Sequence, residues 1–117
     1  MAAYDDDNVF AKILRGELPC KKVYESDHAL AFHDINPQAP VHVLVVPRKH
    51  FASAGEAGES DEALLGHLHR VAAQLAQQHH LTAGHRVVMN TGAAAGQTVF
   101  HVHLHVLGGR SFTWPPG

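Results

Sequence analysis

The stretch His101-Val-His-Leu-His-Val-Leu107 alternates histidine with aliphatic residues near the end of the chain. Side chains on a β-strand point to its two faces in turn, so the stretch predicts a strand over Val99–Leu107. Its histidines then share one face, while Val102, Leu104 and Val106 turn toward the core from the other. We therefore expect the histidines to act together at one site.

Three interpretations of this histidine face are open. The first is a solvated polar face, although such faces usually mix other polar residues. The second is a metal site, but the Cα atoms of His101 and His105 would lie about 13 Å apart, so one ion would need a further ligand from elsewhere. The third is catalysis at phosphorus. A neutral imidazole is a competent nucleophile near pH 7, and its neighbours can donate hydrogen bonds to phosphate oxygens.

The loop before the histidine strand favours catalysis at phosphorus. It offers the side chains of Asn90, Gln97 and Thr98, and it contains Gly92 and Gly96. Glycines let backbone N–H groups approach an anion closely. No lysine follows them, so this is not a Walker A motif. We interpret the loop as a cradle for a phosphate group.

Outward from this strand, the sequence predicts about two helices and about five strands with short connections. Short connections favour antiparallel pairing, because parallel pairs need long crossovers. The predicted fold class is α+β: a five-stranded antiparallel sheet with the helices on one face, in a single domain over residues 1–117. The other predicted elements are a short helix capped by Asn8 and ending near Gly16, strands around Val23–Tyr24, Ala29–His33, Val41–Val46 and Arg86–Asn90, and a long helix capped by Ser60.

Composition narrows the functional class. The chain has 117 residues, of which 45% are hydrophobic, and a formal net charge of −2, which fits one domain without a basic surface for nucleic acid. Its one cysteine, Cys20, excludes an intrachain disulfide framework and a CxxC zinc knuckle. No apolar run approaches a membrane-spanning length, and Asp5, Asp6 and Asp7 stand where a signal peptide needs positive charge. We expect a cytoplasmic protein that binds neither nucleic acid nor membranes.

The histidine strand and several further segments together resemble one known family. From about Val9 to Gly117, the chain resembles the histidine triad (HIT) family, in the branch of histidine triad nucleotide-binding proteins, which are purine nucleoside phosphoramidate hydrolases. The segments that carry the resemblance are His101–Leu107, Phe32–Pro47, Gly96–Phe100, Gly108–Arg110 and Trp114–Gly117.

This resemblance implies a homodimeric hydrolase of purine nucleoside 5′-phosphoramidates and related conjugates such as aminoacyl adenylates. His103 would attack the α-phosphorus and form a nucleotidyl-histidine intermediate. His101 would orient it, His105 would contact phosphate or the leaving group, and His42 on the neighbouring strand would complete the cluster. The reaction implied needs no cofactor and no bound metal.

The resemblance also implies the residues that bind the nucleotide. Asp34 would accept hydrogen bonds from the ribose hydroxyls, and the Trp114 tail would help to shape the leaving-group site. Asp34 and His33 each have an alternative interpretation, Asp34 as a turn residue and His33 as a surface residue. The residues that also fit plain core are Phe10, Ile13, Phe32, Ile35 and Leu44. The implied base pocket comprises Val9, Phe10, Ile13, Phe32, His33, Ile35 and Leu44, and the implied phosphate and leaving-group contacts are Asn90, Gly96, Gln97 and Thr98.

Two departures from the branch concern the leaving group. Thr98 stands where Ser is common, and Ala93–Ala95 are less polar than usual.

The alternative functions are a dinucleoside polyphosphate hydrolase, a nucleotide-sensing or scaffold protein with incidental catalysis, and a histidine-rich metal binder. The sequence leaves open the leaving group and the choice between adenosine and guanosine. The remaining histidines, including His50 at a strand end, are interpreted as structural or surface residues, and Cys20 as an inert small side chain.

Overall fold

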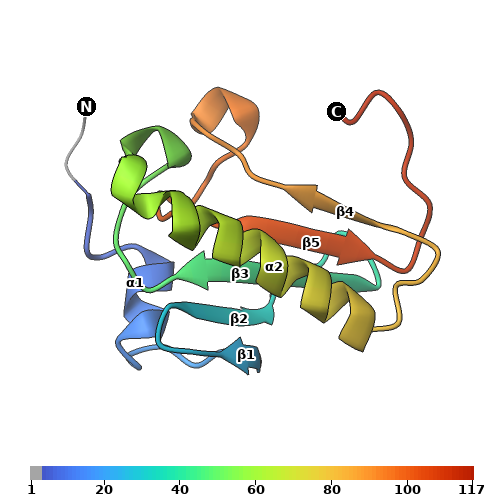
Figure 1. Cartoon of the computed structure of the whole chain (residues 1–117), viewed down its shortest axis with the longest axis horizontal. Helices are drawn as coiled ribbons and strands as arrows, with labels where there is room; N and C mark the ends of the chain where they lie inside the picture. Colours follow the sequence, from blue (N-terminus) through green and yellow to red (C-terminus); the bar gives the residue numbers. More distant parts are fainter. Residues whose placement is uncertain (1–3) are drawn as a thin grey trace.

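The computed structural model describes residues 4–117 and contains one antiparallel sheet with strand order β1-β2-β3-β5-β4 (Figure 1). The predicted α+β class with a five-stranded antiparallel sheet is confirmed. Two α-helices and three short 3-10 helices connect and cover the strands. The strands are Lys22–Glu25 (β1), Ala29–His33 (β2), Val41–Pro47 (β3), His85–Val88 (β4) and Leu104–Gly108 (β5).

The apolar run Val41–Pro47 forms the central strand β3, as its composition predicts. It pairs with β2 on one side and with β5 on the other, so both of its edges are hydrogen-bonded. In an antiparallel pair, directly opposed residues point to the same face. Val43 lies opposite Val106, and Leu44 lies opposite His105. The register therefore places Leu44 on the histidine face and Val43 on the other.

Helix α2 (Glu62–Gln78) covers the face opposite the histidines. Its N-cap is Asp61, because the 3-10 helix Glu59–Asp61 precedes it, so the prediction of Ser60 as the cap was wrong. The Asp61 carboxylate accepts a hydrogen bond from the Gly58 N–H and pairs with Lys49. The core on this face comprises Leu68, Val71, Ala72 and Leu75 of α2 packed on Ala29, Ala31, Val43, Val45, Leu104 and Val106 of the sheet.

Helix α1 (Val9–Leu14) packs on the other face of the sheet, so the prediction that both helices share one face was wrong. Strands β2 and β3 are apolar at almost every position, and such strands need cover on both faces. Phe10 of α1 joins a second buried cluster with Leu30, Phe32, Leu44 and Val46. The predicted cap is confirmed, because the Asn8 Oδ1 atom accepts a hydrogen bond from the Ala11 N–H at 2.9 Å.

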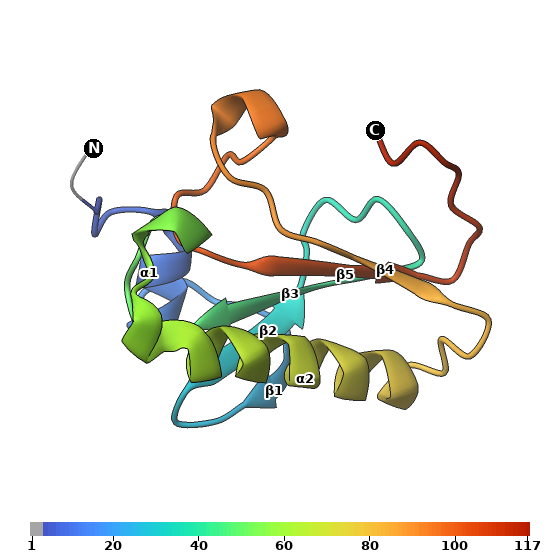
Figure 2. The same cartoon turned by 45° about the horizontal axis from the view of Figure 1, so that its top comes forward.

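The loop before β5 rises from the sheet on the side away from α2. Figure 2 shows α2 along one side of the sheet, with this loop and the C-terminal tail on the other. The loop contains the 3-10 helix Ala93–Ala95 (η3). A further 3-10 helix, Ala54–Glu56 (η1), lies between β3 and α2. Within residues 4–117, no helix is both long enough and apolar enough to cross a membrane.

Candidate active site

The histidine stretch is only partly a regular strand. We expected a strand from Val99, but β5 begins at Leu104. Its pairing with β3 ends at Leu104 opposite Val45, close to Pro47, which has no N–H to continue a ladder. The Val102 N–H donates instead to the Phe51 carbonyl, at 2.9 Å. As a result, only His105 belongs to the strand, while His101 and His103 lie in the extended segment before it.

One ring nitrogen of His103 is hydrogen-bonded to the protein, and the other has no hydrogen-bond partner among residues 4–117. Its Nδ1 lies 2.7 Å from the His101 carbonyl oxygen. A carbonyl can only accept, so Nδ1 carries the proton and Nε2 keeps its lone pair. The ring stands edge-on to Phe10, with centroids 4.8 Å apart. This geometry leaves Nε2 as the nucleophilic atom of a neutral imidazole.

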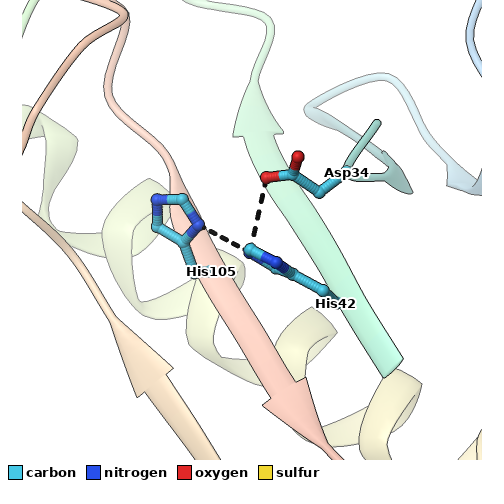
Figure 3. A group of neighbouring side chains, drawn as sticks. All are labelled: Asp34, His42 and His105. Carbon is cyan, nitrogen blue, oxygen red and sulfur yellow. Dashed lines mark hydrogen bonds and ion pairs between the residues drawn. The ribbon is translucent and has the colours of Figure 1, made fainter. Parts of the chain in front are cut away.

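A hydrogen bond joins the ring nitrogens of His42 and His105 (Figure 3). The Gln38 N–H donates to His42 Nδ1 at 3.0 Å, so the proton of His42 is on Nε2. That proton is donated to His105 Nδ1, at 2.9 Å, and Asp34 Oδ2 lies 3.4 Å from the same His42 nitrogen. His105 must then carry its own proton on Nε2. His105 therefore has an N–H donor left for a ligand.

Burial keeps the cluster uncharged at neutral pH. It lowers the pKa of His101 to about 4, and it lowers the pKa of His105 to about 4 with help from His103 and His42. Burial also lowers the pKa values of His103 and His42, partly offset for both by the nearby Asp34 carboxylate. A neutral His103 has its Nε2 lone pair available without first losing a proton.

A cavity of about 220 Å³ opens beside His103 and His105 between α1 and the sheet. Phe10 and Phe32 are buried in its wall, whereas Ile35 is fully exposed at its rim. Apolar and aromatic walls with a few polar groups at one end are typical of small-molecule sites. The expected lining residues found here are Val9, Phe10, Ile13, Phe32, His33, Asp34, Ile35, Leu44 and Thr98, and Pro19, Cys20 and Val99 were not expected.

Residues 15–112 match the HIT domain. The chain belongs to the HIT family. It is 54% identical over 112 residues to an uncharacterized HIT-like protein of Synechococcus elongatus, covering 96% of this chain and 98% of that one. It is also similar to a solved HIT family hydrolase from Legionella pneumophila (TM-score 0.92, 46% identity, 95% of this chain and 100% of that chain). A solved histidine triad nucleotide-binding protein from Candida albicans matches with a TM-score of 0.80 and 30% identity, over 95% and 85% of the two chains.

One predicted pocket residue of this HIT protein points elsewhere. His33 borders the cavity, but its register opposite Val43 places its side chain on the α2 face. There its ring lies 5.9 Å from that of His79, the C-terminal cap of α2. The alternation along β2 carries this signal, because Phe32 and His33 are neighbours and cannot both face α1.

The loop before the histidines is organised by Gln97, whose buried side chain we expected to contact phosphate. Its Oε1 accepts from the Gly92 N–H at 2.9 Å, and its Nε2 donates to the carbonyls of Ala52 and Val99. This amide holds the loop in shape, so any contact with phosphate would have to come from its backbone. Gly96 has a φ of 101°, a region that favours glycine, and it lies beside the Asn90 side chain.

A carboxylate lies closer to the triad of this HIT protein than we expected. Ligand atoms of Asp34, His42 and His105 lie within 4.8 Å of one another, a spacing that a metal ion could use. The hydrogen bond from the Gln38 N–H, however, keeps the proton of His42 on Nε2, which then has no lone pair for an ion. The donor set fits a hydrogen-bonded network better than a metal centre.

The sequence did not predict that two further residues contact His101. Tyr4 places its hydroxyl 2.5 Å from His101 Nδ1, and His50 stacks on the Tyr4 ring with centroids 4.8 Å apart. No spacing rule relates residues so distant in the chain, so no signal in the sequence could have found them. We expected His50 at a strand end, but β3 ends at Pro47 and His50 lies three residues beyond it, with its ring 5.5 Å from that of His101.

The C-terminal tail leaves Trp114 82% exposed. Phe112, in contrast, packs on its own chain: the Cζ atoms of Arg86 and Arg110 lie 5.0 and 4.3 Å from its ring centroid. The Arg86 guanidinium also donates to the Thr113 carbonyl. The tail is therefore anchored at Phe112, with its indole free.

Proposed function

We propose that this protein hydrolyses purine nucleoside 5′-phosphoramidates and related nucleotidyl conjugates through a covalent intermediate on His103. The observation that carries the proposal is the free Nε2 of a neutral His103 at the end of an apolar cavity. The flat walls of Phe10 and Phe32 suit a purine base. Asp34 lines the cavity, where its carboxylate can accept from ribose hydroxyls.

The proposed reaction has two displacements at phosphorus. In the first, His103 Nε2 bonds to the α-phosphorus, the P–N bond breaks, and the amine leaves after taking up one proton. His105 Nε2–H hydrogen-bonds to a phosphate oxygen or to the departing nitrogen. In the second, water bonds to phosphorus, loses one proton and releases His103. Over both steps, one water molecule supplies the amine's proton and the new P–OH group.

The decisive experiment is a substrate panel. Adenosine and guanosine phosphoramidates, aminoacyl adenylates and dinucleoside polyphosphates are compared by kcat/KM, and acid-quenched reactions are searched by mass spectrometry for a nucleotidyl group on His103. We expect the phosphoramidates to be turned over fastest and the adduct to be present. Faster hydrolysis of dinucleoside polyphosphates would favour that alternative activity, and tight nucleotide binding without turnover would favour a sensor.

A chelator tests the metal alternative directly. Because an imidazole is the proposed nucleophile, EDTA followed by dialysis should leave kcat unchanged. Loss of turnover that zinc restores would show that the cluster of Asp34, His42 and His105 works through a metal.

We also infer that the functional protein is a homodimer in which each tail reaches the partner's leaving-group site. The support is the 82% exposed Trp114 side chain at the end of a tail anchored at Phe112. Tryptophan is enriched at protein–protein interfaces relative to the rest of the surface. Sedimentation should give about twice the 12.7 kDa chain mass. Truncation after Gly109 should change kcat/KM unequally among leaving groups, and a monomer or a uniform loss would contradict the inference.

A further inference from the structure

The N-terminal residues of the described chain form a clasp beside His101, outside the lining of the cavity. We define the clasp as Tyr4–Asp7. The Tyr4 ring stacks on His50 at an interplanar angle of 23°, and its hydroxyl meets His101 Nδ1. His50 Nδ1 lies 3.6 Å from Asp6 Oδ1, and Arg15 Nη1 donates to the Asp6 carbonyl at 2.8 Å. The clasp is thus tied to α1 and to the segment that follows β3.

The hydrogen bonds of His101 assign its tautomer. Its Nε2 lies 2.8 Å from the Pro47 carbonyl oxygen, which can only accept, so Nε2 carries the proton. Nδ1 is then an acceptor, and the Tyr4 hydroxyl is its partner among residues 4–117. His101 is completely buried. A buried acceptor that loses its partner costs more free energy than an exposed one, because water does not replace the lost bond.

The ionisation states suit this bond. Burial raises the pKa of the Tyr4 hydroxyl above its ordinary value of 10, so the hydroxyl keeps its proton and donates. Burial lowers the pKa of His101 to about 4, so its ring stays neutral and accepts. Donor and acceptor are therefore matched across the neutral range.

We propose that Tyr4 is a positioning residue for the nucleophile, acting through His101 on His103. Its hydroxyl donates to Nδ1 and so holds the His101 ring in one orientation. The backbone carbonyl of the same His101 accepts the Nδ1–H of His103 and so aims Nε2 at the cavity. This proposal rests on the proposed function, because it concerns the nucleophile of that reaction. It assigns a role in the site to a residue that does not line the cavity.

The test compares the two tyrosines of the chain. Tyr4→Phe keeps the ring on His50 and removes only the hydroxyl. Tyr24→Phe removes the same atom from β1, where Tyr24 packs against the core on the α2 face. The readouts are kcat, KM, nucleoside monophosphate affinity and the ¹⁵N chemical shifts of the His101 and His103 rings.

For Tyr4→Phe we expect kcat to fall about tenfold, the scale of one unsatisfied buried acceptor. KM and nucleoside monophosphate affinity should stay within about twofold, because the cavity is built from other residues. The His101 Nδ1 resonance should move downfield, toward that of an imine nitrogen without a hydrogen bond. Tyr24→Phe should leave all four readouts at their wild-type values.

Unchanged kcat and unchanged ¹⁵N shifts in Tyr4→Phe would overturn the proposal. So would a parallel fall in kcat and in nucleotide affinity, because that pattern indicates general loosening. Asp6→Asn offers a second variant, which weakens the clasp but keeps the hydroxyl, and it should lower kcat by less than Tyr4→Phe does. If the wild-type protein turns over no phosphoramidate, the proposed function fails, and the ¹⁵N shifts still decide whether the Tyr4 hydroxyl donates to His101 Nδ1.

Discussion

The two faces of the sheet are built from the same strands, but one face is filled by a helix and the other keeps a cavity. On one face, the 17 residues of α2 cover the sheet and its core is filled. On the other, the 6 residues of α1 cover only one end, and a cavity remains beside the histidines. Strand β5 contributes to both, with Leu104 and Val106 facing α2 and His105 facing the cavity.

The difference shows that the lengths of the two helices give the two faces of the sheet different roles. A long amphipathic helix fills one face and supplies stability, whereas a short helix walls part of the other and leaves room for a ligand. Substitutions on the α2 face should therefore change folding, and those on the histidine face should change chemistry and binding.

The largest expected effect is on the histidine face. His103→Ala should lower kcat more than ~10³-fold, because it removes the nucleophile, while nucleoside monophosphate affinity persists through the base and ribose contacts. Steady-state kinetics and calorimetry measure the two quantities. His69→Ala, an exposed substitution on α2, is the matched control and should leave both unchanged. Near-wild-type turnover by His103→Ala would remove His103 from its assigned role.

A core substitution on the α2 face should lower stability and leave substrate binding unchanged. Leu75→Ala should reduce the free energy of unfolding by about 2–5 kcal/mol, because Leu75 is fully buried between α2 and the sheet. Urea unfolding measures this loss. Below the unfolding transition, KM should match that of the wild type. A large change in KM would mean that the two faces are coupled.

Asp34 lies where the cavity meets the hydrogen-bonded histidines. Asp34→Ala should weaken binding of ribonucleotides by about 1.5–3 kcal/mol, the cost of a lost charged hydrogen bond. Binding of 2′-deoxy analogues should weaken less, because they lack one of the two donors. Calorimetry with both nucleotides makes the comparison. Equal losses would reassign the carboxylate to the turn, where its Oδ1 already accepts from the Asn36 N–H at 2.8 Å.

The histidine face should also make stability depend on pH. Unfolded histidine takes up a proton near pH 6.5, whereas buried His101 and His105 have pKa values of about 4. Between these values the unfolded chain binds more protons, so the free energy of unfolding falls as pH falls through this window and is level above it. At pH 5.5 each of these two residues should contribute a loss of about 1 kcal/mol.

Urea unfolding at several values between pH 7.5 and pH 5.5 measures that slope. The exposed control His69→Gln should leave it unchanged. A free energy of unfolding that is level across the range would contradict burial of the neutral rings.

The smallest effect concerns the rim of the cavity. Ile35 is fully exposed without a ligand, so Ile35→Ala should change the free energy of unfolding by less than about 0.5 kcal/mol. If the side chain closes on the base, nucleotide affinity should still fall by about 1 kcal/mol, from the apolar area no longer buried. Titration calorimetry at one temperature measures the nucleotide affinity separately from the free energy of unfolding. Unchanged affinity would place Ile35 outside the base contacts.

Local patterns in the sequence determined much of this protein. The apolar run of β3, the Asn8 cap and the helical spacing of α2 are short-range features, and each was found where expected, apart from end residues such as Ser60. The alternation of histidines with aliphatic residues also indicated a shared site, because strand periodicity is a property of the backbone itself.

Only the tertiary structure decided where α1 packs and which tautomers the histidines of the site adopt. The face that α1 covers depends on packing between elements, which local periodicity does not encode. The tautomers of His42 and His103 follow from partners at Gln38 and the His101 carbonyl, and these depend on the path of the backbone. Tyr4 reaches His101 across a separation of 97 residues. A hydrogen bond needs two atoms within about 3 Å, and only the folded chain brings such distant residues that close.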